Sequence, residues 1–428
     1  MGRIGDWITR RYLDDRSLRV ASIAVIAIAL ILLAIGFATA EGGQTAFGSE
    51  LGADYAGFYT AATILNERSP HELYDFELQD RIYHRTLPGI PAEYTLPYVH
   101  PPFVAVAFRP LALLPYSWSF LVWLLISACL YLSGLCAIGK MLRNFPSRTR
   151  TTGLLLALSF EPFIMECWLA GQLSALGFCL IALALLAHSR GRPTLSGFLF
   201  GLCLYKPTFL VLILPMLVIA RCWRHLLGFA MSGAILAIIS LATVGWQTCE
   251  NYAHIVFGFA SVSTGSRTVF QVGKYVDLNS FLKLLTAGSG TTVVWVVFAA
   301  AAGCFLPFLA RAWWRLDRST DHYRQLVMAS TLTGTLVFNI YVGVYDAILV
   351  VLAVILTADA LYRRAPETNR STPPFFKLLL VLLWVTPWFS QFVARETGFQ
   401  PYTLVLAAVG AYQLVLARIP TETPRVVN

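Results

Sequence analysis

The chain has 428 residues, of which 57% are hydrophobic and 13% are charged, and its mean hydropathy is +0.65. An average soluble domain is about 25% charged, so this composition excludes an ordinary soluble protein and predicts an integral membrane protein. The net charge of +9 does not indicate nucleic-acid binding, because the basic residues stand between apolar runs instead of gathering on one soluble face.

The apolar runs predict transmembrane helices, each of which needs about 20 residues to cross the hydrocarbon layer. They lack the alternating pattern of membrane-barrel strands, so the expected fold class is an all-α polytopic membrane protein. The eight cysteines form no CxxC pair, and most of them lie inside apolar runs. They predict buried free thiols, with neither a disulfide framework nor a metal site.

The N-terminal region predicts the orientation of the chain. Residues 1–18 are rich in arginine and are expected in the cytoplasm, followed by a first helix at about 19–40. The ATA at 38–40 has the form of a signal-peptidase site, but the apolar run before it is too long for a signal peptide, which favours an uncleaved helix. Residues 41–100 carry nine acidic residues against three arginines and are predicted to form the first periplasmic loop.

The next elements alternate between the two sides. Residues 103–115 form a short apolar piece between prolines, which suits an interfacial or re-entrant helix. Spans are expected near 117–139, 151–168 and 172–188. Residues 194–220 begin and end beside cytoplasmic arginines but are interrupted by Lys206 and Pro207. Because proline breaks a helix, this segment is predicted to be two short helices that meet inside the membrane.

The second half of the chain adds further spans. One is expected near 226–244, followed by an outer periplasmic loop at 245–290, and another near 291–310. Four more are expected near 325–341, 347–362, 375–391 and 401–418, before a cytoplasmic tail at 419–428. Together they predict one domain over 19–418 with about 10–12 transmembrane helices. No internal repeat is visible, unlike in many secondary transporters.

This topology places the polar residues that are costly in a membrane on the outer side. A charged residue at the bilayer centre costs about 2.5–3.5 kcal/mol on insertion scales, so several on one face predict a shared polar cavity. The alternative is that charges at helix ends mark the membrane surface, and for Glu166 alone that alternative is favoured. The residues concerned are Asp54, His100, Glu161, Glu166, Gln172, Lys206 and Asp346.

Four segments within residues 50–362 resemble, in order, the sequence blocks of glycosyltransferase family 87. They are GADYAGFYTAATILNERSPHELYD, the HPP of YVHPPFVAVAFRPLALLP, the stretch from AGQLSALGF to LYKPTFLVLILP, and YDAILVVLAVIL. The resemblance implies a GT-C-fold enzyme of the plasma membrane whose active site faces the periplasm. It further implies a polyprenyl-phosphate-linked sugar donor, with mannose as in the actinobacterial members, and a lipid or glycan acceptor.

Asp54 is the candidate catalytic residue, because the resemblance implies that a carboxylate just after the first helix is the general base. A single base that takes the acceptor proton suffices for direct displacement with inversion, and such a base contributes about 10²- to 10⁴-fold in rate. The alternative is that Asp54 caps the helix that follows, since aspartate is a favoured N-cap.

Lys206 and His100 are the candidate ligands of the donor phosphate. A lysine in an apolar setting, followed by the start of a helix, offers a compact cation and free N–H groups to a phosphate. The alternative for Lys206 is a side chain that snorkels to the interface. His100 precedes two prolines, which hold its backbone extended. It could bind the phosphate or the acceptor, or serve a structural purpose.

The remaining candidates are expected to contact the sugar or the acceptor. Gln172 could hydrogen-bond sugar hydroxyls or hold two helices together. Asp346 and Tyr345 belong to the YD block. Asp346 is interpreted as a sugar contact or as a carboxylate that supports another site residue. Glu161 is a further candidate for a sugar or acceptor contact. Where some family members carry a histidine near this block, the chain has Asn339, Tyr341 and Tyr345. This departure puts phosphate contacts from that helix in doubt.

Two further expectations concern the loop at 245–290 and metals. Arg267, Lys274 and Asp277 suit either a lid over a lipid headgroup or simple solvation, and the sequence leaves both open. No DxD cluster for a nucleotide sugar is visible, so neither a cofactor nor a metal is expected.

Two functions compete with the enzyme. A transporter or flippase would place polar residues at both faces and show a repeat, and a purely structural subunit would not explain Asp54 and Lys206 on one face.

Overall fold

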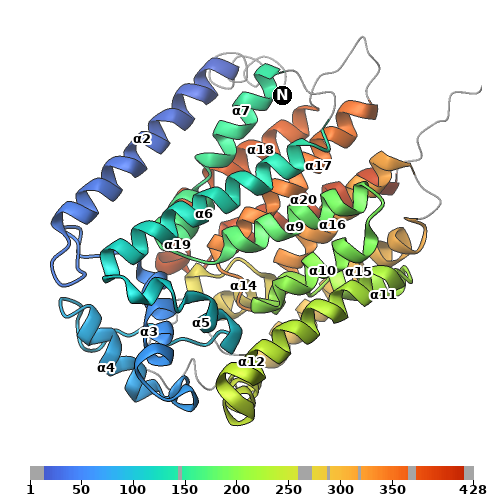
Figure 1. The fold of residues 1–428 in the computed structure, drawn as a ribbon. Coiled ribbons are helices and arrows are strands. Elements are labelled where there is room, and N and C mark those ends of the chain that lie inside the picture. The colour runs from blue at the N-terminus through green and yellow to red at the C-terminus, as the bar shows by residue number, and fades with distance from the viewer. Residues whose placement is uncertain are drawn as a thin grey trace, which may run out of the picture.

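The computed structural model describes residues 14–142, 147–258, 272–286, 290–316, 320–364 and 373–418. In these residues the chain folds into a bundle of helices, with only isolated β-bridges besides (Figure 1). The predicted all-α polytopic membrane fold is confirmed. Most of the cytoplasmic N-terminus, the tail at 419–428 and Arg267 lie outside the described residues.

Six helices in the described ranges are long and apolar enough to cross a membrane. They are α2 (Asp15–Thr39), α6 (Tyr116–Gly139), α12 (Trp223–Phe257), α15 (Thr291–Trp314), η8 with α17 (Val344–Ile348 and Leu349–Arg364) and α20 (Pro401–Arg418). Two bent pairs raise the number to eight if each pair is one span. One pair joins α7 (Ser147–Leu158) to α8 (Glu161–Phe163) and η3 (Ile164–Leu169) at 46°, and the other joins α18 (Pro374–Val385) to α19 (Pro387–Thr397) at 67°.

The expected total of about 10–12 spans also includes shorter helices. These are α9 (Ser174–Ser189), α10 (Pro193–Leu202), α11 (Ile213–Ile219) and α16 (Asp321–Val337). Helices α10 and α11 are separated by η4 (Cys203–Tyr205) and η5 (Pro207–Leu210), which meet at Lys206. The segment is therefore two short helices with a break at the predicted position, because proline cannot continue the hydrogen-bond ladder.

Small residues bring α10 and α12 into close contact. Gly197 and Gly201 of α10 lie against the stretch of α12 that contains Gly228 and Ser232. A Cβ atom on Gly197 would lie 1.8 Å from the carbonyl oxygen of His225, so no larger residue fits there. This small-xxx-small packing is typical of membrane helices and fixes the end of α10 that leads to the break.

Short helices gather at one end of the bundle, called here the loop end. They are α3 (Ala53–Glu67), η1 (Pro70–Glu72), α4 (Phe76–Thr86), α5 (Pro102–Phe108) and η2 (Leu111–Leu113). Figure 1 shows α3, α4 and α5 at the lower left, far from the N-terminal end of α2 and from α7. Helices α5 and η2 are too short to cross a bilayer, in agreement with the interfacial or re-entrant piece expected at 103–115.

Helix α12 extends further than the sequence predicted. The expected span ended near 244, but the helix continues to Phe257, and α14 (Leu278–Leu285) is also helical, so much of the described part of the predicted loop is not irregular. Gly245 adopts φ 78° within α12, which a glycine tolerates, and the chain resumes a helix after this kink. The added turns pack on the loop end, where Tyr252 stacks on Tyr74 with ring centroids 6.0 Å apart.

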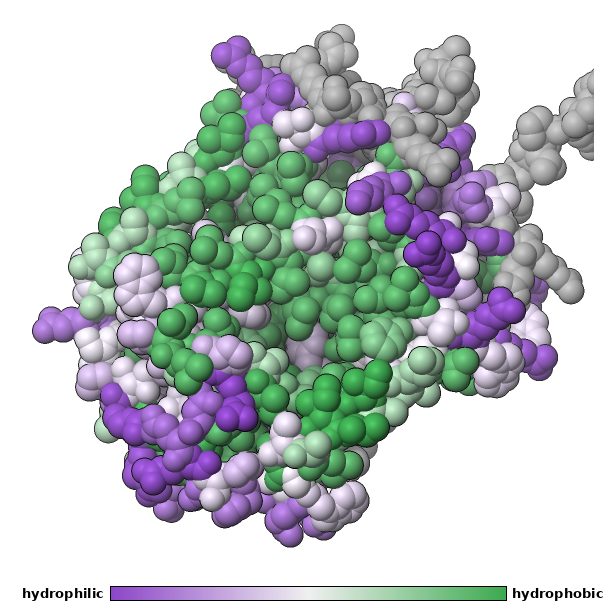
Figure 2. All heavy atoms as spheres, viewed as in Figure 1, coloured by the Kyte–Doolittle hydropathy of each residue, from purple (hydrophilic) through white to green (hydrophobic). Residues whose placement is uncertain are grey.

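The surface separates into an apolar belt and polar ends. Figure 2 shows hydrophobic side chains over the middle of the bundle, with hydrophilic ones over α4 at the lower left and at the opposite side. Ile31 of α2 and Ile238 of α12 are 58% and 63% exposed. Such exposure suits contact with lipid, as expected of a protein whose belt crosses a bilayer.

Candidate functional site

Asp54 stands in the first turn of α3, which is docked against the turn after η3. The backbone N–H groups of Asp54 and Tyr55 donate to the carbonyl oxygen of Ala170 at 3.0 and 3.3 Å. Gly171 has φ 79°, and a Cβ atom there would meet the Cβ atom of Tyr55 at 2.6 Å. The N-cap of α3 is Gly52, without a side-chain cap hydrogen bond, so the alternative that Asp54 is the cap is wrong.

The surroundings of the Asp54 carboxylate raise its pKa to about 6. Loss of hydration is the largest cause, and the charge of Glu166 acts in the same direction. Lys274, the side-chain amide of Gln172 through a hydrogen bond, and Lys206 oppose this shift. The carboxylate is therefore mainly ionised at neutral pH and more basic than an ordinary aspartate.

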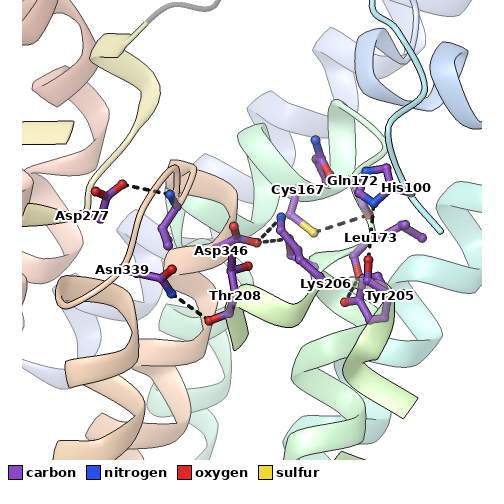
Figure 3. A network of polar contacts seen from close by, with 12 residues as sticks. His100, Cys167, Gln172, Leu173, Tyr205, Lys206, Thr208, Asp277, Asn339 and Asp346 are labelled. Atoms are coloured by element: carbon purple, nitrogen blue, oxygen red, sulfur yellow. Dashed lines mark hydrogen bonds and ion pairs between the residues drawn. The ribbon is translucent and has the colours of Figure 1, made fainter. Parts of the chain in front are cut away.

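Lys206 points into the protein, toward η8. Its Nζ lies 2.7 Å from Oδ1 of Asp346, and the two side chains are 12% and 0% exposed (Figure 3). The same Nζ lies 4.3 Å from the ring centroid of Tyr345 and 5.5 Å from that of Phe209. A buried ion pair between two aromatic rings does not match a snorkelling lysine, whose charged end stays in water.

Asp346 is held from two sides through one oxygen. Besides Lys206, Ser174 at the start of α9 donates its hydroxyl to Oδ1 at 2.6 Å. The other oxygen, Oδ2, is buried and has no hydrogen-bond partner among the described residues. An unsatisfied buried acceptor of this kind is costly, which suits an atom that meets a ligand.

His100 lies beside the break that carries Lys206. Its Nδ1 is 3.5 Å from the carbonyl oxygen of Tyr205, and its own carbonyl accepts a hydrogen bond from Tyr74 at 2.7 Å. Burial, followed by the charge of Lys206, lowers the pKa of His100 to about 4. The imidazole is thus neutral, and because its one N–H group on Nδ1 donates to the carbonyl oxygen of Tyr205, the other ring nitrogen is a hydrogen-bond acceptor.

Most of the expected residues gather at one site. Asp54, Gln172, Lys206 and Asp346 are linked by the interactions above, and Tyr345 and His100 flank Lys206. Glu166 acts on Asp54 and accepts a hydrogen bond from Gln391 at 2.7 Å.

Glu161 is linked to Asp54 indirectly. It is buried at the bend between α7 and α8, and its interaction with the site runs through Glu166.

Comparisons with known proteins identify the family of the chain. The sequence profile of glycosyltransferase family 87 matches residues 98–341, which is more than half of the chain. The chain belongs to glycosyltransferase family 87. The profile covers His100, Gln172 and Lys206 but begins after Asp54 and ends before Asp346.

A curated relative also matches part of the family 87 chain. It is the polyprenol-phosphate-mannose-dependent alpha-(1-2)-phosphatidylinositol pentamannoside mannosyltransferase of Mycolicibacterium smegmatis, 34% identical over 136 residues. The aligned stretch covers 31% of this chain and 30% of that relative. No solved structure matches, so the GT-C likeness stays a prediction.

Several residues of this family 87 site were not predicted as site residues. Lys274, which acts on Asp54, belongs to a segment that is paired to the loop before Asp346 through a bridge between Tyr275 and Gly343. Asp277 strengthens the pairing, because it caps α14 at Ser280 and also accepts the N–H of Val342 at 2.9 Å. The sequence analysis considered Lys274 and Asp277 only as loop residues that suit a lid or simple solvation, because a local pattern does not indicate a distant partner.

Asn339 and Ser174 support the break and its ion pair. Asn339 donates to the carbonyl oxygen of Thr208 at 2.7 Å and so holds η5 beside α16 (Figure 3). Ser174 was not singled out in the sequence, because a serine in AGQLSA reads as an ordinary helix start.

No group of three or more His, Cys, Asp or Glu side chains lies close enough for a metal ion in the parts of the chain that are described. Metal independence stays a prediction.

Proposed function

We propose that this family 87 protein is an inverting glycosyltransferase that transfers a hexose from a polyprenyl-phosphate donor to a hydroxyl of a lipid or glycan acceptor. The observation that carries the proposal is that a carboxylate of raised pKa, Asp54, shares one site with a buried lysine, Lys206. Mannose is the first sugar to test, because the relative's name specifies a mannose donor.

The reaction needs a base at one end of the site and a cation at the other. Asp54 accepts the proton of the acceptor hydroxyl while the hydroxyl oxygen attacks the anomeric carbon. The bond from that carbon to the phosphate oxygen breaks, and the polyprenyl phosphate leaves with the electron pair. Lys206 balances the charge on the leaving phosphate. One direct displacement of this kind inverts the anomeric configuration.

The other residues take supporting roles in this proposal. With its one N–H group donated from Nδ1 to the carbonyl oxygen of Tyr205, His100 contacts an acceptor hydroxyl through its other ring nitrogen, and Gln172 holds the Asp54 carboxylate while it contacts the sugar or acceptor. The free Oδ2 of Asp346 accepts a sugar hydroxyl, with Tyr345 beside it. Glu161 remains a candidate for an acceptor contact, reached beyond Glu166. Because Asp346 already binds Lys206, the phosphate and Asp346 both contact the Lys206 ammonium group in this proposal.

The site is proposed to face the periplasm from the plasma membrane. The support is the excess of acidic over basic residues in residues 41–100, which form most of the loop end. Reporter fusions at Glu77 and Arg148 should report opposite sides of the membrane. The same side for both would contradict the topology.

A direct assay tests the activity. Purified protein in lipid nanodiscs, given polyprenyl-phosphate mannose or glucose and a crude lipid acceptor, should form a glycosylated lipid of inverted configuration, with or without EDTA. If the protein instead moves the lipid-linked sugar across a vesicle membrane and transfers no sugar to an acceptor, that result favours the transporter or flippase. Family membership and the position of the charges at one end of the bundle favour the enzyme.

A further inference from the structure

A second carboxylate, Glu50, lies beside Asp54 and has no role in the proposed reaction. It stands four residues before Asp54, at the end of a short loop that follows α2 and carries the bridge between Gln44 and Glu50. The loop is fixed by the N–H of Leu51, which donates to Gly43 at 2.9 Å. The backbone of Glu50 is therefore held at the entrance of α3.

The two oxygens of Glu50 have different surroundings. Oε2 accepts the hydroxyl of Tyr83, a fully buried residue of α4, at 2.7 Å. Oε1 is shielded from solvent and has no hydrogen-bond partner in the residues that the structure describes. The tyrosine fixes the orientation of the carboxylate, and the free oxygen loses hydration without compensation.

Electrostatic interactions link Glu50 to Asp54 and to Lys274. Loss of hydration is the main reason that the pKa of Glu50 rises to about 7. Tyr83 opposes the shift through its hydrogen bond, Asp54 adds to it, and Lys274 opposes it, but Lys206 is not among these causes. A phosphate would be repelled by two adjacent carboxylates, whereas a hydroxyl group is a suitable ligand.

We propose that Glu50 determines acceptor specificity by accepting a hydrogen bond from a second hydroxyl of the acceptor, next to the hydroxyl that Asp54 deprotonates. This inference rests on the proposed function and names its substrate class. The acceptor is a polyol, such as a sugar or cyclitol headgroup, because a simple alcohol cannot occupy both carboxylates. A site built to bind a hydroxyl discriminates strongly against an analogue that lacks it.

The test uses octyl α-D-mannoside and its monodeoxy analogues as acceptors for the full-length protein. The wild-type enzyme should lose about 10- to 100-fold in kcat/KM when the hydroxyl beside the reacting one is absent, the range expected for a hydrogen bond to a charged group. Glu50→Gln should lose about tenfold on the complete acceptor through KM, with the donor KM unchanged. The same deoxy analogue should then cause little further loss.

Two more variants distinguish a specific change in acceptor preference from misfolding and from a general loss of activity. Tyr83→Phe keeps the carboxylate but removes its orienting hydrogen bond, so it should weaken the same hydroxyl preference by a few fold. Glu77→Gln, an exposed glutamate on α4, should behave as the wild type. Equal elution on gel filtration verifies that each variant is folded.

Three results would overturn the inference. Glu50→Gln and Tyr83→Phe could keep the wild-type acceptor profile, the loss could appear in the donor KM, or octanol could serve as well as octyl mannoside. Failure of the wild-type protein to glycosylate any mannoside or lipid acceptor would overturn the proposed function, and the inference with it.

Discussion

The two halves of the site handle charge in opposite ways. In the half around Lys206, the cation and Asp346 are joined at 2.7 Å, and Ser174 adds a hydrogen bond to the same carboxylate oxygen. In the half around Asp54, the carboxylates of Asp54 and Glu50 share the distant influence of Lys274, and neither forms an ion pair in the described part of the chain. The half around Lys206 is suited to holding a fixed charge. The half around Asp54 is suited to accepting a proton, or a hydrogen bond from a hydroxyl group.

Replacing the base should give the largest effect. Asp54→Asn keeps the size of the side chain and does not disturb the cap, which is Gly52. Because the basic lone pair is lost, turnover should fall by at least about 10², with little change in donor affinity. Single-turnover rates with purified protein measure this. A variant with near-parental turnover would move the base to Asp346 or Glu161.

Breaking the ion pair should affect both binding and stability. Lys206→Met keeps the aliphatic stem but leaves a buried Asp346 uncompensated, which costs about 3–5 kcal/mol of stability. Donor affinity should fall as well, with Lys206→Arg partly restoring it.

The double variant Lys206→Met with Asp346→Asn separates these two effects. It should recover thermal stability without recovering donor binding, as measured by thermal unfolding and donor titration. An unchanged donor affinity in Lys206→Met would show that the lysine only supports the fold.

The pH profile tests the second half of the site. With Asp54 as the proposed base, kcat/KM is expected to rise with pH through about 6, where the carboxyl loses its proton. Its folded pKa lies above the usual value, so its contribution to stability is complete below about pH 4 and is lost as the pH rises through about 6.

The variant Lys274→Met tests what sets the midpoint of that pH profile. It removes the largest influence that lowers the pKa of Asp54, so the rise should shift to higher pH while Glu166, Gln172 and Lys206 still act. Rates measured from pH 5 to 8 in both proteins decide this. An identical midpoint would show that Lys274 does not face the base in solution.

The smallest effect is expected from Ser174→Ala. It removes one hydrogen bond to Asp346 but leaves the ion pair with Lys206, so stability should fall by about 1 kcal/mol. Donor KM should rise only a few fold. A loss as large as that of Lys206→Met would mean that the serine, and not the lysine, controls the position of Asp346.

Local patterns were enough to predict much of the fold. The lengths of the apolar runs located the spans, and Pro207 located the break, because both depend on neighbouring residues alone. The end of α12 was misplaced because Gly245 permits either a helix end or a kink, and the longer helix depends on tertiary contacts such as the packing of Tyr252 on Tyr74. The alternative that Asp54 caps α3 could not be excluded from the sequence for a similar reason, since Gly52 and Asp54 are both acceptable at a helix start.

Pairs that depend on tertiary packing could not be predicted. The sequence singled out Lys206 and Asp346, but they are 140 positions apart, and nothing local indicates that one neutralises the other. Lys274 and Glu50 gain their significance only from proximity to Asp54. In the sequence they are an ordinary loop lysine and one acid among many.

The contact between α10 and α12 limits how a long lipid can reach the site. Gly197 lies against the backbone at His225, and the two helices cannot separate or slide without losing this close contact, so we expect them to move together. The break at Lys206 follows directly from this pair and keeps its position while other helices shift. For the proposed polyprenyl-phosphate donor, we therefore expect the lipid tail to enter between helices other than α10 and α12, and residues along that entry should set which donor tail lengths are accepted.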